Sequence, residues 1–117
     1  MKVSWYRCGM NNEFCLLDKV NLNLPMFDDK NGVYIIWSNN VKRVLKIGSG
    51  QIRERLMKHI NNPEILIYKD LYVTWTFVEG KQMLGIEKYL GDLYEPIIGD
   101  RFPDVTPVVV NLPFGEV

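Results

Sequence analysis

The chain has 117 residues, of which 47% are hydrophobic and 24% are charged; this composition suits one globular domain and excludes a disordered chain. Its formal net charge is +0, so the chain as a whole lacks the strongly basic balance that is common in nucleic-acid-binding domains. No apolar run approaches the roughly 18 residues of a membrane span, and the first residues have no apolar signal segment. We therefore expect a cytoplasmic protein.

The N-terminal quarter has no clear hydrophobic period. We expect residues 1–31 to form an arm that packs on a single domain made by residues 32–117. Cys8 and Cys15 are the only cysteines, and the chain has one histidine, so no ligand set for a structural zinc exists. Because a reducing compartment keeps thiols reduced, two free thiols are expected rather than a disulfide.

Two strand-like segments follow, at residues 32–37 and 43–47, with the turn signal Ser38-Asn39-Asn40 between them. They are predicted to pair as a hairpin. Gly48-Ser49-Gly50 is interpreted as a flexible junction to a helix over residues 51–60.

An aromatic and β-branched segment at residues 71–77 predicts a third strand. A helix over residues 81–94 follows, and Pro96 ends it. Its predicted apolar stripe consists of Met83, Leu84, Ile86, Leu90 and Leu93. The run Val108-Val109-Val110 suggests a further short strand. The predicted fold class is α+β: a small, mainly antiparallel three-stranded sheet flanked by helices in the order β-β-α-β-α, with extra strand-like segments at both termini.

Charge is unevenly distributed along the chain. Residues 41–60 contain six basic residues and one acidic residue, whereas residues 79–117 contain three basic and seven acidic residues. Such a molecule can bind a polyanion with one face while it stays neutral overall; a merely solvated hairpin and helix face is the alternative. The candidate nucleic-acid-binding residues are Lys42, Arg43, Gly48, Ser49, Arg53 and Lys58.

Five features in a fixed order carry the functional interpretation. Gly32-Val33-Tyr34 and Lys46-Ile47-Gly48 are tripeptides on the two hairpin strands, and Arg55 and His59 stand four apart on the following helix. The later features are Glu87 on the second long helix and Asn111 after the last apolar run. This set resembles the motifs of the GIY-YIG nuclease superfamily over about residues 32–113.

The resemblance implies a metal-dependent endonuclease that acts on DNA or RNA and leaves 5′-phosphate and 3′-hydroxyl ends. It makes Tyr34 the general base, Arg55 the clamp on the phosphate and Glu87 the ligand of one Mg²⁺ or Mn²⁺. Since a phenol has an unperturbed pKa of about 10, a nearby cation would have to lower the pKa of Tyr34. His59 would share the base role or orient water, although a surface or helix-capping histidine is the simpler alternative.

Lys46 stands where the family usually has tyrosine. A lysine there could stabilise the Tyr34 phenolate, bind phosphate directly, or mark a site that has lost catalysis and kept binding. Arg53 competes with Arg55 for the clamp role, but Arg55 keeps the helical register with His59, so Arg53 is expected to contact backbone phosphate or solvent.

The terminal asparagine and the choice of substrate are less constrained by the sequence. Asn111 could equally begin a turn before Pro113. Substrate choice would come from residues 1–31, a specificity partner or self-association. The alternative functions are a catalytically inactive nucleic-acid-binding module on the same fold, and a protein-interaction domain that exposes the aromatic strand of Tyr72, Trp75 and Phe77.

Overall fold

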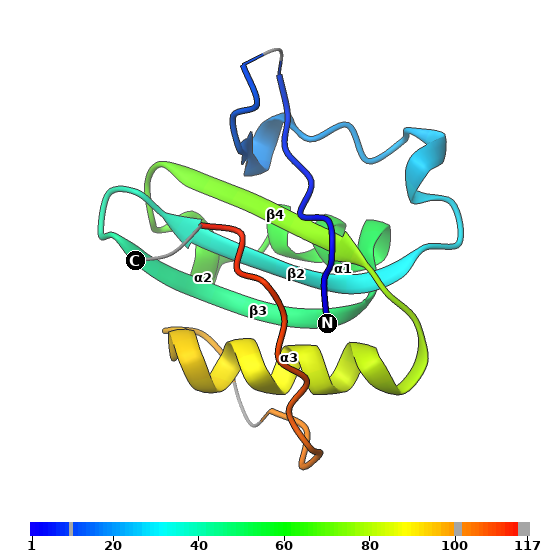
Figure 1. The fold of residues 1–117 in the computed structure, drawn as a ribbon. Helices are drawn as coiled ribbons and strands as arrows, with labels where there is room; N and C mark the ends of the chain where they lie inside the picture. Colours follow the sequence, from blue (N-terminus) through cyan, green and yellow to red (C-terminus); the bar gives the residue numbers. More distant parts are fainter. Residues whose placement is uncertain (10, 100–101, 115–117) are drawn as a thin grey trace.

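The computed structural model describes residues 1–9, 11–99 and 102–114. Its sheet has four antiparallel strands in the order β1-β4-β2-β3 (Figure 1). The strands are β1 (Cys15–Leu16), β2 (Asn31–Ser38), β3 (Arg43–Gln51) and β4 (Leu71–Phe77). The helices are α1 (Ile52–Ile60), α2 (Pro63–Leu66) and α3 (Gly80–Tyr94), and two 3-10 turns cover Leu17–Lys19 and Pro25–Phe27.

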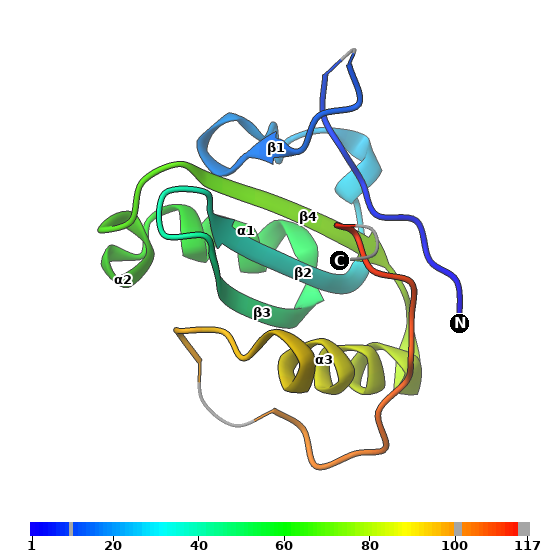
Figure 2. The same ribbon diagram turned by 60° about the vertical axis from the view of Figure 1, so that its left-hand side comes forward.

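The central strand β2 is buried on both faces, so the sheet lies between two apolar layers. Side chains alternate along a strand, and Tyr34 and Ile36 pack with α1 and α2, whereas Val33 and Ile35 pack with α3. Figure 2 shows α3 on one side of the sheet and α1 with α2 on the other. The α+β class predicted from the sequence is confirmed, with β1 as a fourth strand.

Several predicted details are wrong for local reasons. Residues 48–50 are not a flexible junction, because β3 continues through Gln51, where it pairs with Asn31 of β2. Residues 108–110 form no strand; this stretch instead packs over α3. The unpredicted helix α2 begins at Pro63, where the side chain of Asn62 caps it by accepting from Glu64 N.

The buried stripe of α3 also differs from the prediction. Leu84 and Leu93 are 38% and 48% exposed, while Gly85 and Gly91 are buried. The two glycines let neighbouring chain approach the helix closely, and an added Cβ on Gly85 would lie 2.4 Å from Val108. Close packing of the C-terminal segment therefore replaces part of the expected apolar stripe.

The N-terminal arm runs along β4 and the C-terminal segment. Tyr6 N donates to Trp75 O at 2.9 Å, and the hydroxyl of Thr74 donates to Tyr6 O at 2.7 Å. Cys8 and Cys15 form a disulfide with Cα atoms 4.8 Å apart, so the expectation of two free thiols is wrong. The reason is geometric, because the turn that pairs Cys8 with Glu13 brings the two cysteines face to face.

Candidate active site

Four elements surround one polar cavity of about 400 Å³. Strand β2 contributes one aromatic ring and β3 a run of four residues. Helix α1 contributes three side chains, and α3 contributes one carboxylate. The lining residues are Tyr34, Lys46, Ile47, Gly48, Ser49, Arg55, Lys58, His59 and Glu87. Segments far apart in the sequence therefore place most of the predicted site residues around one space.

Both tripeptides require glycine, at Gly32 and Gly48, because neighbouring atoms occupy the space that a Cβ atom would fill. Gly48 pairs with Tyr34 across the hairpin, and a Cβ on Gly48 would lie 2.2 Å from the Tyr34 Oη atom. A Cβ on Gly32 would lie 2.0 Å from the carbonyl oxygen of Thr76 on β4. Gly32 thus lets two strands approach, and Gly48 lets the phenol reach the cavity across β3.

The phenol of Tyr34 is the most buried polar group of the cavity. Tyr34 is 2% exposed, and its Oη lies 2.6 Å from His59 Nε2. Burial raises the pKa of Tyr34, and the negative charge of Glu87 adds to this effect, while Arg55 opposes it. The expected net lowering of the Tyr34 pKa is therefore wrong: burial outweighs the cation, and the phenol is protonated at neutral pH.

His59 is neutral in the same pH range. Burial, followed by the charges of Lys46, Arg55 and Lys58, lowers the pKa of His59 to about 4. Its Nδ1 atom is buried without a hydrogen-bond partner, whereas its Nε2 atom faces the Tyr34 hydroxyl. A neutral imidazole next to a protonated phenol leaves Nε2 free to accept the phenolic hydrogen.

Glu87 is the one carboxylate among the described residues that line the cavity. It is half-buried, and its Oε1 accepts a hydrogen bond from the Ser49 hydroxyl. Three cationic side chains face this single negative charge, namely Lys46, Arg55 and Lys58. The cavity is therefore electropositive, as a phosphate site requires.

The oxygen donors of the cavity fit one Mg²⁺ ion that keeps most of its water ligands. Mg²⁺ prefers hard oxygen ligands and commonly uses one or two carboxylates with waters and substrate phosphates. Glu87 supplies such a carboxylate, held by Ser49. Among residues 1–9, 11–99 and 102–114, no group of three or more histidine, cysteine or acidic side chains could form an all-protein metal site.

Two predicted site residues lie away from the cavity. Asn111 is bound to the N-terminal arm: its Oδ1 accepts from Val3 N at 2.7 Å, and its Nδ2 donates to Val3 O at 3.0 Å. Arg53 donates to the carbonyls of Leu22 and Leu24 and pairs with Asp28 at 2.6 Å. The expectation that Arg53 faces phosphate or solvent is therefore wrong, because its guanidinium holds the N-terminal arm.

The remaining basic candidates divide between two places. Lys58 lines the polar cavity, whereas Lys42 and Arg43 line a second cavity at the end of the β2–β3 hairpin. The contact between Ser49 and Glu87 was not anticipated from the sequence. No local signal predicts it, because it depends on how α3 packs against β3.

Comparison with models of protein families, with curated proteins and with solved structures finds no match to this chain. Within the described part of the chain, no helix is both long enough and apolar enough to cross a membrane.

Proposed function

We propose that this protein is a metal-dependent endonuclease that hydrolyses phosphodiester bonds in DNA. One observation carries the proposal: a phenol, an imidazole, a guanidinium and a carboxylate from β2, α1 and α3 line the same electropositive cavity as Lys46. Hydrolysis of a phosphodiester needs a proton acceptor for water, cations at the phosphoryl oxygens and stabilisation of the leaving oxygen.

The cations of the cavity would hold the scissile phosphate. Arg55 is exposed on α1 and offers a planar fork that matches two phosphate oxygens. Lys46 and Lys58 add point charges at the same cavity. In this arrangement Lys46 binds phosphate, and the cation that opposes the raised pKa of Tyr34 is Arg55.

The base would be the hydrogen-bonded pair of Tyr34 and His59. Burial keeps the phenol protonated, so Tyr34 can accept a proton from water only as its own proton moves to Nε2 of the neutral His59, 2.6 Å away. The water oxygen then attacks phosphorus, and the P–O3′ bond breaks. The products are a 5′-phosphate and a 3′-hydroxyl that takes its proton from solvent.

Glu87 would hold one Mg²⁺ or Mn²⁺, which would supply positive charge that stabilises the charge developing on the phosphate oxygens. Ser49 fixes the carboxylate of Glu87 on the cavity side of α3. A single carboxylate suits an ion that keeps most of its waters and takes phosphate oxygens as further ligands.

Plasmid nicking in Mg²⁺ tests the proposal. Glu87→Gln removes the charge and keeps the acceptor for Ser49, so we expect nicking to fall at least about 100-fold while the melting temperature changes little. Glu95→Gln is the matched control, because Glu95 is exposed after α3 and does not line the cavity. Equal nicking by wild type and Glu87→Gln would overturn the proposal.

A catalytically inactive nucleic-acid-binding module is the second candidate. Lys46 in place of the family's tyrosine and the raised pKa of Tyr34 both favour it. Salt-dependent DNA binding without cleavage in Mg²⁺ or Mn²⁺ would identify such a module. The protein-interaction alternative has less support, because Trp75 is 3% exposed and Tyr72 and Phe77 are only partly exposed.

A cytoplasmic location belongs to the same proposal, since DNA is the expected substrate. The disulfide between Cys8 and Cys15 would then face a reducing environment. Alkylation of free thiols in freshly lysed cells measures whether the bond persists there.

A further inference from the structure

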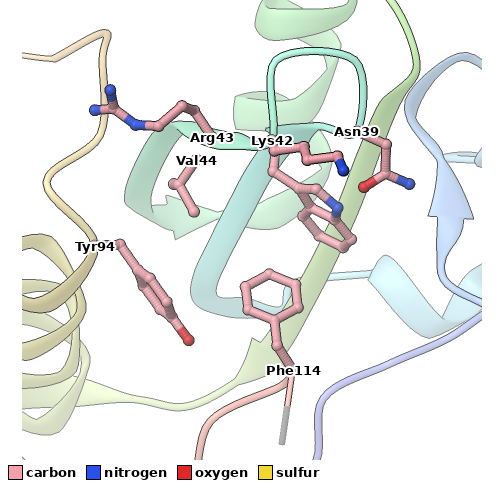
Figure 3. A pocket seen from close by; sticks show the side chains of 7 residues that line it. Asn39, Lys42, Arg43, Val44, Tyr94 and Phe114 are labelled. Carbon is pink, nitrogen blue, oxygen red and sulfur yellow. The ribbon is translucent and has the colours of Figure 1, made fainter. Parts of the chain in front are cut away.

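A second cavity, of about 520 Å³, lies at the turn end of the β2–β3 hairpin. Two of its aromatic residues come from distant parts of the chain, one at the end of α3 and one in the C-terminal segment (Figure 3). The residues that matter here are Trp37, Asn39, Lys42, Arg43, Tyr94 and Phe114. None of these residues lines the polar cavity.

The walls of this aromatic cavity are rings that support one another. Phe114 makes edge-to-face contacts with Trp37 at 4.7 Å and with Tyr94 at 5.6 Å between ring centroids. Phe14 packs against both Trp37 and Phe114, at 4.9 Å and 5.7 Å. Because each ring is held by neighbours, the cavity is formed before any ligand arrives.

Positive charge and an amide lie at the rim. Lys42 and Asn39 are exposed in the hairpin turn (Figure 3). Arg43 extends away from Phe114 and donates to Glu95 O at 3.1 Å. Within the described part of the chain, neither Lys42 nor Arg43 pairs with an acidic side chain. An apolar aromatic pocket with positive charge at its rim is complementary to a flat ring that carries an anionic group.

We propose that the aromatic cavity binds one unpaired nucleotide of the nucleic-acid substrate. Bases stack on aromatic side chains whatever their sequence, and the cavity volume is in the range of small-ligand sites. Lys42 meets the phosphate, and the Asn39 amide can donate to and accept from a base edge. A base inside a duplex is stacked on both faces and cannot enter, so the occupant comes from a single-stranded or frayed segment.

The position of the cavity on β3 ties it to the proposed active site. Val44 lines the aromatic cavity, and Lys46 and Gly48 line the polar one, so at 3.3 Å per strand residue the two sites lie about 7 to 13 Å apart along β3. That separation corresponds to about two to four stacked nucleotides. Along this part of β3, the backbone N–H groups of Ile97 and Ile98 donate to the carbonyl oxygens of Val44 and Leu45. The inference thus rests on the proposed function and names its substrate class: DNA with unpaired bases beside the cleaved bond.

Fluorescence anisotropy with a labelled 12-nucleotide single strand and its blunt duplex, in EDTA, tests the inference. We expect tighter binding to the single strand and a Kd about tenfold higher in Tyr94→Leu. Lys42→Ala, an exposed change that leaves the fold intact, is expected to reduce the slope of log K against log salt by about 0.7. Lys81→Ala, exposed at the start of α3, is the control and should behave as wild type.

The two proposals can fail separately. If wild type nicks plasmid but binds both oligonucleotides equally, with no effect of Tyr94→Leu or Lys42→Ala, the nucleotide site is refuted and the nuclease stands. If wild type never nicks but both variants weaken single-strand binding, the aromatic cavity stands and the nuclease fails. Tyr34→Phe should abolish nicking and leave single-strand affinity unchanged; loss of affinity in this variant would place the single strand at the polar cavity instead.

Discussion

Replacing Gly48 with alanine tests the proposed base most directly. The new Cβ would lie 2.2 Å from Tyr34 Oη, whereas ordinary van der Waals contact begins at 3.4 Å. To relieve this overlap, the phenol must move by about 1.2 Å, and the close-packed interior around it resists such a move. That displacement breaks the 2.6 Å contact between Tyr34 Oη and His59 Nε2.

Two magnitudes follow from this displacement. A misplacement of about 1 Å in a catalytic group costs about 100-fold in rate, so the nicking rate constant of Gly48→Ala should fall by about that factor. Overpacking next to a fully buried ring should also reduce the free energy of unfolding by about 1–3 kcal/mol. Single-turnover nicking in Mg²⁺ and urea denaturation measure the two effects on one preparation.

Gly9→Ala separates a lost site from a weakened fold. Gly9 has φ +79° with open space around its Cβ position, so alanine there costs about 1–2 kcal/mol from backbone strain alone. This control should lose stability and keep the nicking rate. A Gly48→Ala protein that is folded at the assay temperature and nicks as fast as wild type would refute the role of the Tyr34–His59 pair.

Three further outcomes are expected. Ser49→Ala removes the hydrogen bond to Glu87 and should raise the Mg²⁺ concentration needed for half-maximal nicking about 10- to 100-fold; an unchanged metal requirement would exclude this positioning role. Since the pKa of His59 is about 4 in the fold and 6.5 in an unfolded chain, the unfolded state binds the proton more readily, and stability should fall as pH drops from 6.5 towards 4. Urea titrations at pH 7 and pH 5 should show wild type losing up to about 1–2 kcal/mol more than His59→Gln, after allowance for the partial exposure of the ring. Arg53→Ala should lower stability and leave the salt dependence of DNA binding unchanged, whereas Lys58→Ala should do the reverse; the opposite pattern would mean that Arg53 faces the nucleic acid.

The sequence was sufficient for elements whose signals are local. The strand at residues 71–77 and the two long helices were predicted almost to the residue, because period and turn residues mark their ends. The juxtaposition of Arg55 and His59 also follows from helix geometry alone. The hairpin itself was predicted, but its pairing of Tyr34 with Gly48 was not, because the register shifts between Ile36 and Trp37.

Features that depend on packing between distant segments could not be predicted. The Tyr34 pKa is decided by burial beneath α1, which no residue near Tyr34 reveals. The aromatic cavity needs Trp37, Tyr94 and Phe114 to meet, and nothing in their local sequences marks that meeting. Arg53 was misplaced because the 3-10 turn and loop that bind it have no hydrophobic period.

The contacts between the two ends of the chain make the aromatic cavity depend on the N-terminal arm. The backbone N–H of Val3 donates to the side-chain oxygen of Asn111, and Trp5 Nε1 donates to Asn111 O at 2.8 Å. The Arg7 guanidinium donates to Pro113 O at 3.2 Å. These hydrogen bonds hold the segment that carries Phe114, so the N-terminal arm stabilises one wall of the aromatic cavity. A protease cut within the first seven residues would loosen that wall while the polar cavity kept its four walls on β2, β3, α1 and α3.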